Sequence, residues 1–225
     1  MMRTRSGLSF RDVLMALALA GLIAPGGVAA AQDARPPRGA VPPGHPETGP
    51  KTPEPAVALP MEPAGRKKIL DELFDKLAKA PDEREARGLA NAIERVWMRS
   101  GSDTSDLLMS RALQAMQAKD NQLAQELLDR VVEIHPDWAE ALNKRATARY
   151  LMEDYGGAME DISRALKLEP RHFGALAGMG FILQKTQNEK LALRAFRKAL
   201  EFNPQQEELK KIVEKLAGEV DGSDI

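Results

Sequence analysis

Residues 139–170 read AEALNKRATARYLMEDYGGAMEDISRALKLEP, two patterned segments joined by a turn at residues 153–155 and closed by Pro170. Small residues stand in both segments, with Ala146 in the first and Ala158 in the second. Two antiparallel helices can approach closely only where such small side chains meet. The stretch therefore predicts a helical hairpin in which Ala146 faces Ala158.

The same pattern returns every 34 residues. Prolines stand at Pro136, Pro170 and Pro204, where they end each unit because proline cannot continue a helix. Columns of large or small apolar residues keep the same step: Leu108, Leu142 and Leu176; Ala112, Ala146 and Gly180; Ala124, Ala158 and Ala192; Leu128, Ile162 and Phe196; Val131, Ala165 and Ala199; Ile134, Leu168 and Phe202. One such hairpin cannot bury its apolar face alone, so neighbouring units must stack.

This period and these columns resemble the tetratricopeptide repeat (TPR), a helix–turn–helix unit of 34 residues. The resemblance implies an all-α, right-handed solenoid with repeats at residues 103–136, 137–170 and 171–204. The first repeat matches the family less well than the others, because Leu108 stands where the family often has tryptophan.

Helical patterns continue on both sides of the repeats. Residues 66–79 and 82–99 carry apolar side chains at helical spacing, which predicts a degenerate N-terminal hairpin over residues 66–102 that caps the stack. A C-terminal capping helix with one charged face is predicted within residues 205–218, and Gly218 is expected to end it.

The turns between repeats carry a helix-start signal and two of the three histidines. Asp137 and Glu140 have the spacing of a capping box, which predicts the start of the next helix. His135 and His172 lie at successive turns, whereas His45 lies far upstream. A metal site needs more ligands than these turns supply, so we expect neither a metal nor a cofactor.

The N-terminal part of the chain predicts export. Residues 1–31 place arginines before an apolar run and then small residues, the order of a secretory signal peptide, with cleavage expected near Ala31. The apolar run of residues 13–24 is shorter than the roughly 20 residues of a transmembrane helix, so an uncleaved membrane anchor is the weaker alternative. Residues 32–65 are rich in proline, which predicts a disordered linker.

Composition excludes several classes of function. A formal net charge of −1 is a poor electrostatic footprint for nucleic acid. The chain has no cysteine, which excludes disulfides, thiolate metal sites and cysteine nucleophiles. The sequence also shows no serine-nucleophile motif and no phosphate-binding glycine loop, so we predict that the protein is not an enzyme.

The resemblance also implies a binding surface, because the first helix of each repeat lines the concave face of a TPR stack. The side chains expected there are Met109, Leu113, Met116, Asn143, Lys144, Thr147, Tyr150, Phe181, Gln184 and Lys185. For Leu113, Met116 and Phe181, packing between the repeats is an equal alternative. Some family members grip a peptide carboxylate with basic residues, but only Lys144 is basic among the matching positions, so an acidic C-terminal ligand is not supported.

These observations predict a periplasmic scaffold or adaptor that binds a protein or peptide in its concave groove. Its contact with the membrane would be limited to the export signal. Two alternatives remain open: a self-associating structural module, which would be a homo-oligomer, and a non-catalytic accessory subunit of an envelope-assembly enzyme.

Overall fold

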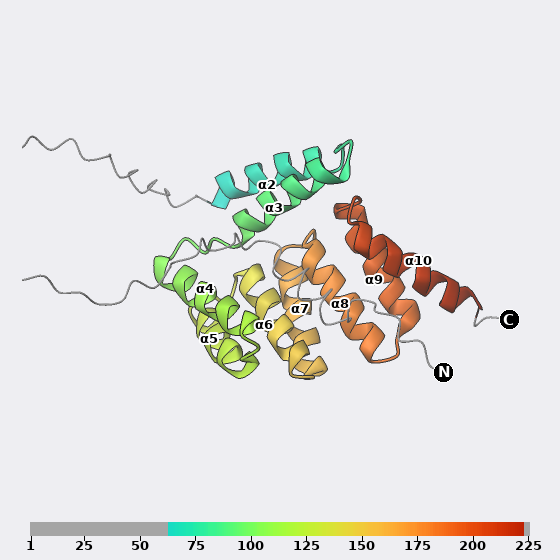
Figure 1. Ribbon diagram of the computed structural model, residues 1–225. Coiled ribbons are helices and arrows are strands. Elements are labelled where there is room, and N and C mark those ends of the chain that lie inside the picture. Colours follow the sequence, from blue (N-terminus) through green and yellow to red (C-terminus); the bar gives the residue numbers. More distant parts are fainter. Residues whose placement is uncertain (1–62, 223–225) are drawn as a thin grey trace, which may run out of the picture.

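The computed structural model describes residues 63–222, which form α-helices and no strands (Figure 1). The helices are α2 (Pro63–Leu77), α3 (Glu83–Trp97), α4 (Asp103–Gln117), α5 (Asn121–Ile134), α6 (Ala139–Leu151), α7 (Tyr155–Leu168), α8 (Phe173–Lys185), α9 (Glu189–Phe202) and α10 (Glu207–Gly222). Within this part of the chain, no helix has the length and apolar character needed to cross a membrane. The predicted signal peptide and nearly all of the predicted linker lie outside the described residues.

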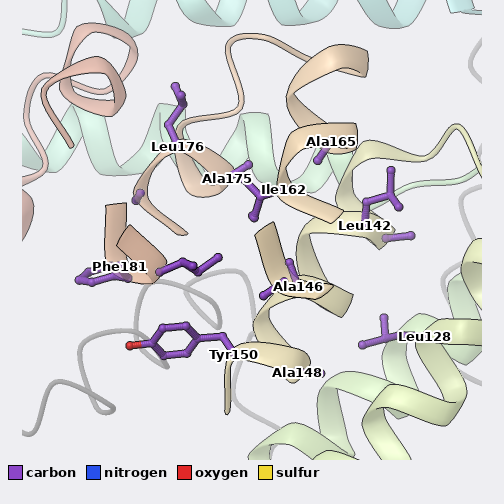
Figure 2. Packing of buried hydrophobic residues seen from close by; sticks show 14 of the residues in the cluster. Leu128, Leu142, Ala146, Ala148, Tyr150, Ile162, Ala165, Ala175, Leu176 and Phe181 are labelled. Atoms are coloured by element: carbon purple, nitrogen blue, oxygen red, sulfur yellow. The ribbon is translucent and has the colours of Figure 1, made fainter. Parts of the chain in front are cut away.

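Six of these helices form the predicted stack of hairpins. The pairs α4–α5, α6–α7 and α8–α9 are the three repeats, and each pair contacts the next along the stack (Figure 1). Figure 2 shows the centre of the stack, where Leu142, Ala146 and Ile162 pack between neighbouring helices. The all-α solenoid expected from the repeat columns is confirmed.

Each repeat makes its internal turn in the same way. Lys119, Glu153 and Gln187, which stand 34 residues apart, all have positive φ angles of 62°, 65° and 61°. A left-handed residue at this place ends the first helix and reverses the chain. In the first two repeats the next residue, Asp120 or Asp154, caps the second helix by accepting a hydrogen bond from a backbone amide of its first turn.

Small residues allow the helices of a hairpin to approach closely. Ala112 and Ala124 in the first repeat are fully buried, as their columns predict. In the third repeat, a Cβ added at Gly180 would overlap the ring of Phe196. A close approach at Gly180, expected from the column of small residues that it shares with Ala112 and Ala146, is therefore confirmed, with Phe196 as the nearest side chain.

The structure differs from the prediction at the N-terminal end of the stack, because α2 and α3 do not stack on α4. Leu107 on the outer face of α4 is 54% exposed, and Gln114 on the same face is also exposed. Their counterparts 34 residues later, Ala141 and Ala148, are fully buried against the preceding repeat. The outer face of α4 is thus open to solvent, and the stack ends there without a further hairpin.

The C-terminal helix is longer than predicted. It runs through Gly218 to Gly222, because Val220 beyond the glycine is buried together with Leu209 and Leu216. Burial of this extra apolar residue favours another helical turn over a stop at Gly218. The predicted end was wrong, but α10 packs on α9 and covers that end of the stack as expected.

Candidate functional site

The first candidate surface is the A-helix face, formed by α4, α6 and α8, where the sequence placed ten binding positions. The predicted exposure was wrong for seven of these side chains, which are at most 8% exposed: Met109, Leu113, Met116, Asn143, Lys144, Tyr150 and Phe181. The five apolar or aromatic residues among them belong to the main hydrophobic core. The alternative, packing between the repeats, therefore holds for Leu113, Met116 and Phe181.

Close packing between neighbouring helices and repeats explains this burial. For example, Gly178 on α8 faces α7, where a Cβ at this position would lie 3.3 Å from Ile162. What remains at the surface is polar: Thr147 and Gln184 are partly exposed and Lys185 is exposed. A small dip of about 10 Å³, room for a single water molecule, lies between Thr147, Tyr150 and Gly178.

The second candidate surface is the turn edge, formed by residues 135–139 and 169–173 together with Phe202, against which α2 and α3 pack. Phe74 on α2 meets Phe173 and Phe202 edge-on, with ring centroids 6.4 Å and 6.2 Å apart. These residues form a second apolar cluster with the inner faces of α2 and α3. The hairpin is thereby joined to the last repeat, far from α4 in the stack.

Polar contacts reinforce this attachment. Arg171 Nη1 donates to Asp71 Oδ1 over 2.7 Å, and the Arg171 guanidinium lies 4.5 Å from the centre of the Phe74 ring. The hydrogen bonds from Lys67 and Arg171 lower the pKa of Asp71. Arg66 Nη2 donates to the Val96 carbonyl over 2.8 Å and so satisfies one of the last backbone acceptors of α3.

A cleft of about 850 Å³ lies between α2 and the turn edge. Its lining residues are Arg66, Lys67, Leu70, Asp71, Trp97, Ser100, His135, Asp137, Trp138, Ala139, Glu140, Leu168, Glu169, Pro170 and Arg171. The cationic residues in this set are already engaged, since Arg66 binds backbone carbonyls, Lys67 binds Asp71, and Arg171 binds Asp71 and Glu169. The cleft therefore does not present a concentrated positive charge to a ligand.

Behind the cleft lies a polar cluster that the sequence did not predict. Glu140 is 3% exposed and accepts from His172 Nε2 over 2.7 Å and from Asn143 Nδ2 over 3.2 Å, while Lys144 Nζ lies 3.0 Å away. Burial alone would raise the pKa of Glu140, but the charge of Lys144 and the hydrogen bond from His172 outweigh it and lower the pKa to about 2.

The predicted capping box at Asp137 is therefore wrong. The N-cap of α6 is Trp138, which makes no side-chain capping bond. Glu140 turns inward to His172 and Lys144, because a buried carboxylate gains more from these two partners than from an exposed backbone amide. The sequence around Glu140 does not indicate this pairing, because His172 is 32 residues away along the chain.

The hairpin contributes two residues of α3 to this cluster. The indole of Trp97 stacks on the His172 ring, with centroids 4.0 Å apart and the planes at 16°. Burial raises the pKa of Glu94 to about 7, and the nearby charge of Glu140 adds to this increase while Lys144 opposes it. The hairpin thus places a second carboxyl group beside Glu140.

A separate ion network ties three helices of the stack together. Asp161 on α7, 2% exposed at its side chain, accepts from Arg145 Nε over 2.8 Å and from Nη2 over 2.7 Å. Arg149 lies 2.9 Å from the same carboxylate, and Arg145 also binds Asp129 on α5 over 2.9 Å. Every charge in this network has a partner, so its role is to hold the repeats together. The part of the chain described by the structure contains no group of three or more His, Cys, Asp or Glu residues suited to a metal ion.

Comparison with known proteins agrees with the repeat architecture. The tetratricopeptide-repeat family profile matches residues 174–206. A TPR repeat-containing protein of Rhizobium etli is 42% identical over 156 residues, which span 68% of this chain and 76% of that protein. The chain belongs to the tetratricopeptide-repeat family, whose members are helical scaffolds.

Two solved structures share the fold. The Sgt2 TPR domain from Aspergillus fumigatus superposes with a TM-score of 0.52 at 24% identity, over 55% of this chain and 83% of that domain. The first TPR domain of Spaghetti (RPAP3), solved bound to an HSP90 peptide, gives a TM-score of 0.50 at 16% identity, over 52% of this chain and 93% of that domain. At these identities the likeness concerns the arrangement of helices.

Proposed function

We propose that the chain is an exported adaptor that holds a segment of a partner protein or peptide on the A-helix face of α6 and α8. Membership of a family of helical scaffolds supports a binding role. The observation that carries the proposal is the polar character of this face, where Thr147, Gln184 and Lys185 are the predicted positions that remain at the surface.

The chemistry of this face suits a short extended or helical segment. The Gln184 amide can both donate and accept hydrogen bonds, which matches the backbone of a bound segment. Lys185 would favour an acidic group on the partner. The shallow dip beside Gly178 is too small for a large side chain, so a methyl-sized group is the expected occupant. Such a site would bind weakly and selectively, as expected of an adaptor.

Export is the second part of the proposal. It rests on residues 1–31, whose basic, apolar and small-residue segments lie outside the described residues. When the full chain is expressed in a Gram-negative host, the mature protein should begin near Gln32 and appear in the periplasmic fraction. An intact Met1 on a membrane-bound product would instead establish the uncleaved anchor.

The binding face is tested by photo-cross-linking in intact cells. A photoreactive residue at position 184 should yield a discrete cross-link to another protein, whereas the same residue at Lys167, exposed on α7, should yield none. The change Lys185→Glu should reduce this cross-link, and Lys167→Glu should leave it unchanged. Equal cross-linking at both positions would contradict the proposal, and cross-links to a second copy of the chain would support the self-associating module.

A further inference from the structure

The cleft between α2 and the turn edge has the size of a ligand site. Its volume is about 850 Å³, and ligand pockets typically measure roughly 300–1,000 Å³. Its acidic residues Asp71, Glu140 and Glu169 are paired within the protein, as its cationic residues are. Much of the remaining lining is apolar: Leu70, Trp97, Trp138, Ala139, Leu168 and Pro170. The cleft therefore suits an uncharged, partly apolar occupant.

Beside the cleft lies an apolar column that α2 covers only in part. The column consists of Ile134, Leu168 and Phe202, the last residues of α5, α7 and α9. Phe74 of α2 contacts Phe202, whereas Ile134 is 52% exposed and Leu168 is 46% exposed. Leu168 lines the cleft, and Ile134 is adjacent to His135, which also lines it. The interface that α2 makes at Phe202 thus continues toward the first repeat as an apolar surface that the described residues leave exposed.

The chain upstream of α2 carries matching chemistry. Residues 33–54 contain a single large apolar residue, whereas Val57, Leu59 and Met61 follow within five positions. Because these three stand at alternate positions, they share one side of an extended backbone. They belong to the run PAVALPM, residues 55–61, which contains no charged residue. Its two prolines favour an extended backbone, so the run matches a cleft that is apolar and balanced in charge.

The PAVALPM run is also close enough to reach the cleft. Helix α2 begins at Pro63, and both Arg66 and Leu70 from its first two turns line the cleft. An extended proline-rich backbone rises about 3.1 Å per residue, so the run can span about 20 Å. The part of α2 from Arg66 to Asp71 is only about 8 Å long, because a helix rises about 1.5 Å per residue. Attachment to α2 gives the run a high effective concentration at the cleft.

We propose that the PAVALPM run of the same chain docks in this cleft in an extended form, with Val57, Leu59 and Met61 facing the apolar column. The docked run covers Leu168 and continues the contact of α2 along the turn edge. It makes part of the proline-rich segment an intramolecular ligand of the stack. This contact is independent of partner binding on the A-helix face.

Photo-cross-linking within the purified protein tests the docking. A photoreactive residue in place of Leu59 should form cross-links to the peptides that hold residues 134–139 and 168–171, as identified by mass spectrometry. The same residue in place of Val41, which lies farther upstream in the proline-rich segment, should give about tenfold less of these products.

Two matched substitutions test the surface. Leu168→Ser removes an exposed apolar side chain from the cleft lining, and should lower the cross-link yield from position 59 about three- to tenfold. Leu123 is 44% exposed and lies in the first turn of α5, at the opposite end of that helix from Ile134. Leu123→Ser should therefore leave the yield unchanged.

The tryptophans give a readout that needs no cross-linker. Trp97 and Trp138 are the only two tryptophans of the chain, and both line the cleft. In nitrogen-15 NMR, their indole N–H signals should shift in Leu59→Ser and keep their positions in Val41→Ser.

Three results would overturn the proposal. The first is equal cross-linking from positions 41 and 59, or a yield that Leu168→Ser does not change. The second is the absence of any indole shift in Leu59→Ser. The third concerns a mixture of nitrogen-15-labelled and unlabelled protein, in which each cross-link should join segments of one chain. Cross-links that join labelled to unlabelled segments would identify a second copy as the occupant.

Discussion

Trp138 Nε1 donates a hydrogen bond of 2.7 Å to the backbone carbonyl of Trp97, across 41 residues of sequence. Trp138 belongs to the turn between the first two repeats, and Trp97 is the last residue of α3. The bond therefore joins the end of the hairpin to the turn edge, next to the ring stack of Trp97 on His172. It helps to satisfy a helix-end carbonyl, which also accepts a longer hydrogen bond of 3.2 Å from Arg66 Nη2.

Replacing Trp138 tests this bond. The change Trp138→Phe keeps an aromatic ring but removes the donor, and leaves the Trp97 carbonyl with only the longer hydrogen bond from Arg66. We expect a loss of about 0.5–1.5 kcal/mol in the stability of the hairpin attachment. Hydrogen exchange should show faster opening of α3 and unchanged opening of α8; equal protection of α3 in both proteins would show that the bond contributes nothing.

Gly180 offers a packing test with a matched control. In Gly180→Ala the new methyl group overlaps the Phe196 ring, so we expect a destabilisation of about 1–3 kcal/mol and a lower Tm. Gly88 lies on α3 with open space around it, and Gly88→Ala should stabilise by about 0.5–1 kcal/mol because alanine favours helix. Thermal unfolding followed by circular dichroism distinguishes the two. A Tm that rises in both variants would contradict the close approach at Gly180.

The Asp161 network predicts a large loss of stability from one neutralised charge. In Asp161→Asn, Arg145 and Arg149 lose the carboxylate that both contact in the core of the second repeat. Breaking a buried ion pair costs about 3–5 kcal/mol. The neighbouring Glu160 is exposed, so Glu160→Gln should change the free energy of unfolding by less than about 0.5 kcal/mol. Urea unfolding measures both, and equal midpoints would show that the network is not a structural tie.

Acid should destabilise the protein through Glu140. Because the pKa of Glu140 falls from 4.5 to about 2 in the folded protein, its contribution to stability is present above pH 4.5 and is lost as the pH falls through about 2. Urea unfolding between pH 6 and pH 2 should show this decline in the wild type. The decline should be smaller in Glu140→Gln, which is less stable at pH 6. A variant with the full acid dependence of the wild type would place the titrating group elsewhere.

The repeat architecture was predictable because each hairpin depends on its own residues, and the same residue types recur every 34 positions. Proline at Pro136, Pro170 and Pro204 and small residues at Ala146 and Gly180 act on the turns and hairpins in which they stand. Their spacing is therefore sufficient to define the hairpins. The same reasoning placed the ten A-helix positions on the correct helices, but it could not say how closely neighbouring helices approach, and seven of the ten side chains are buried.

The position of the N-terminal hairpin was decided by contacts between distant residues. Glu140 has the spacing of a cap for its own helix, yet it binds His172, and Asp71 binds Arg171 from 100 residues away. Neither pairing leaves a periodic trace in one sequence. Sequence periodicity indicates which side chains turn inward within one repeat. The partner of a charged side chain such as Glu140 or Asp71 depends instead on which helices pack together in the folded protein. Here α2 and α3 meet the turn edge through the rings of Phe74 and Phe173 and the ion pair of Asp71 with Arg171, and not through the outer face of α4.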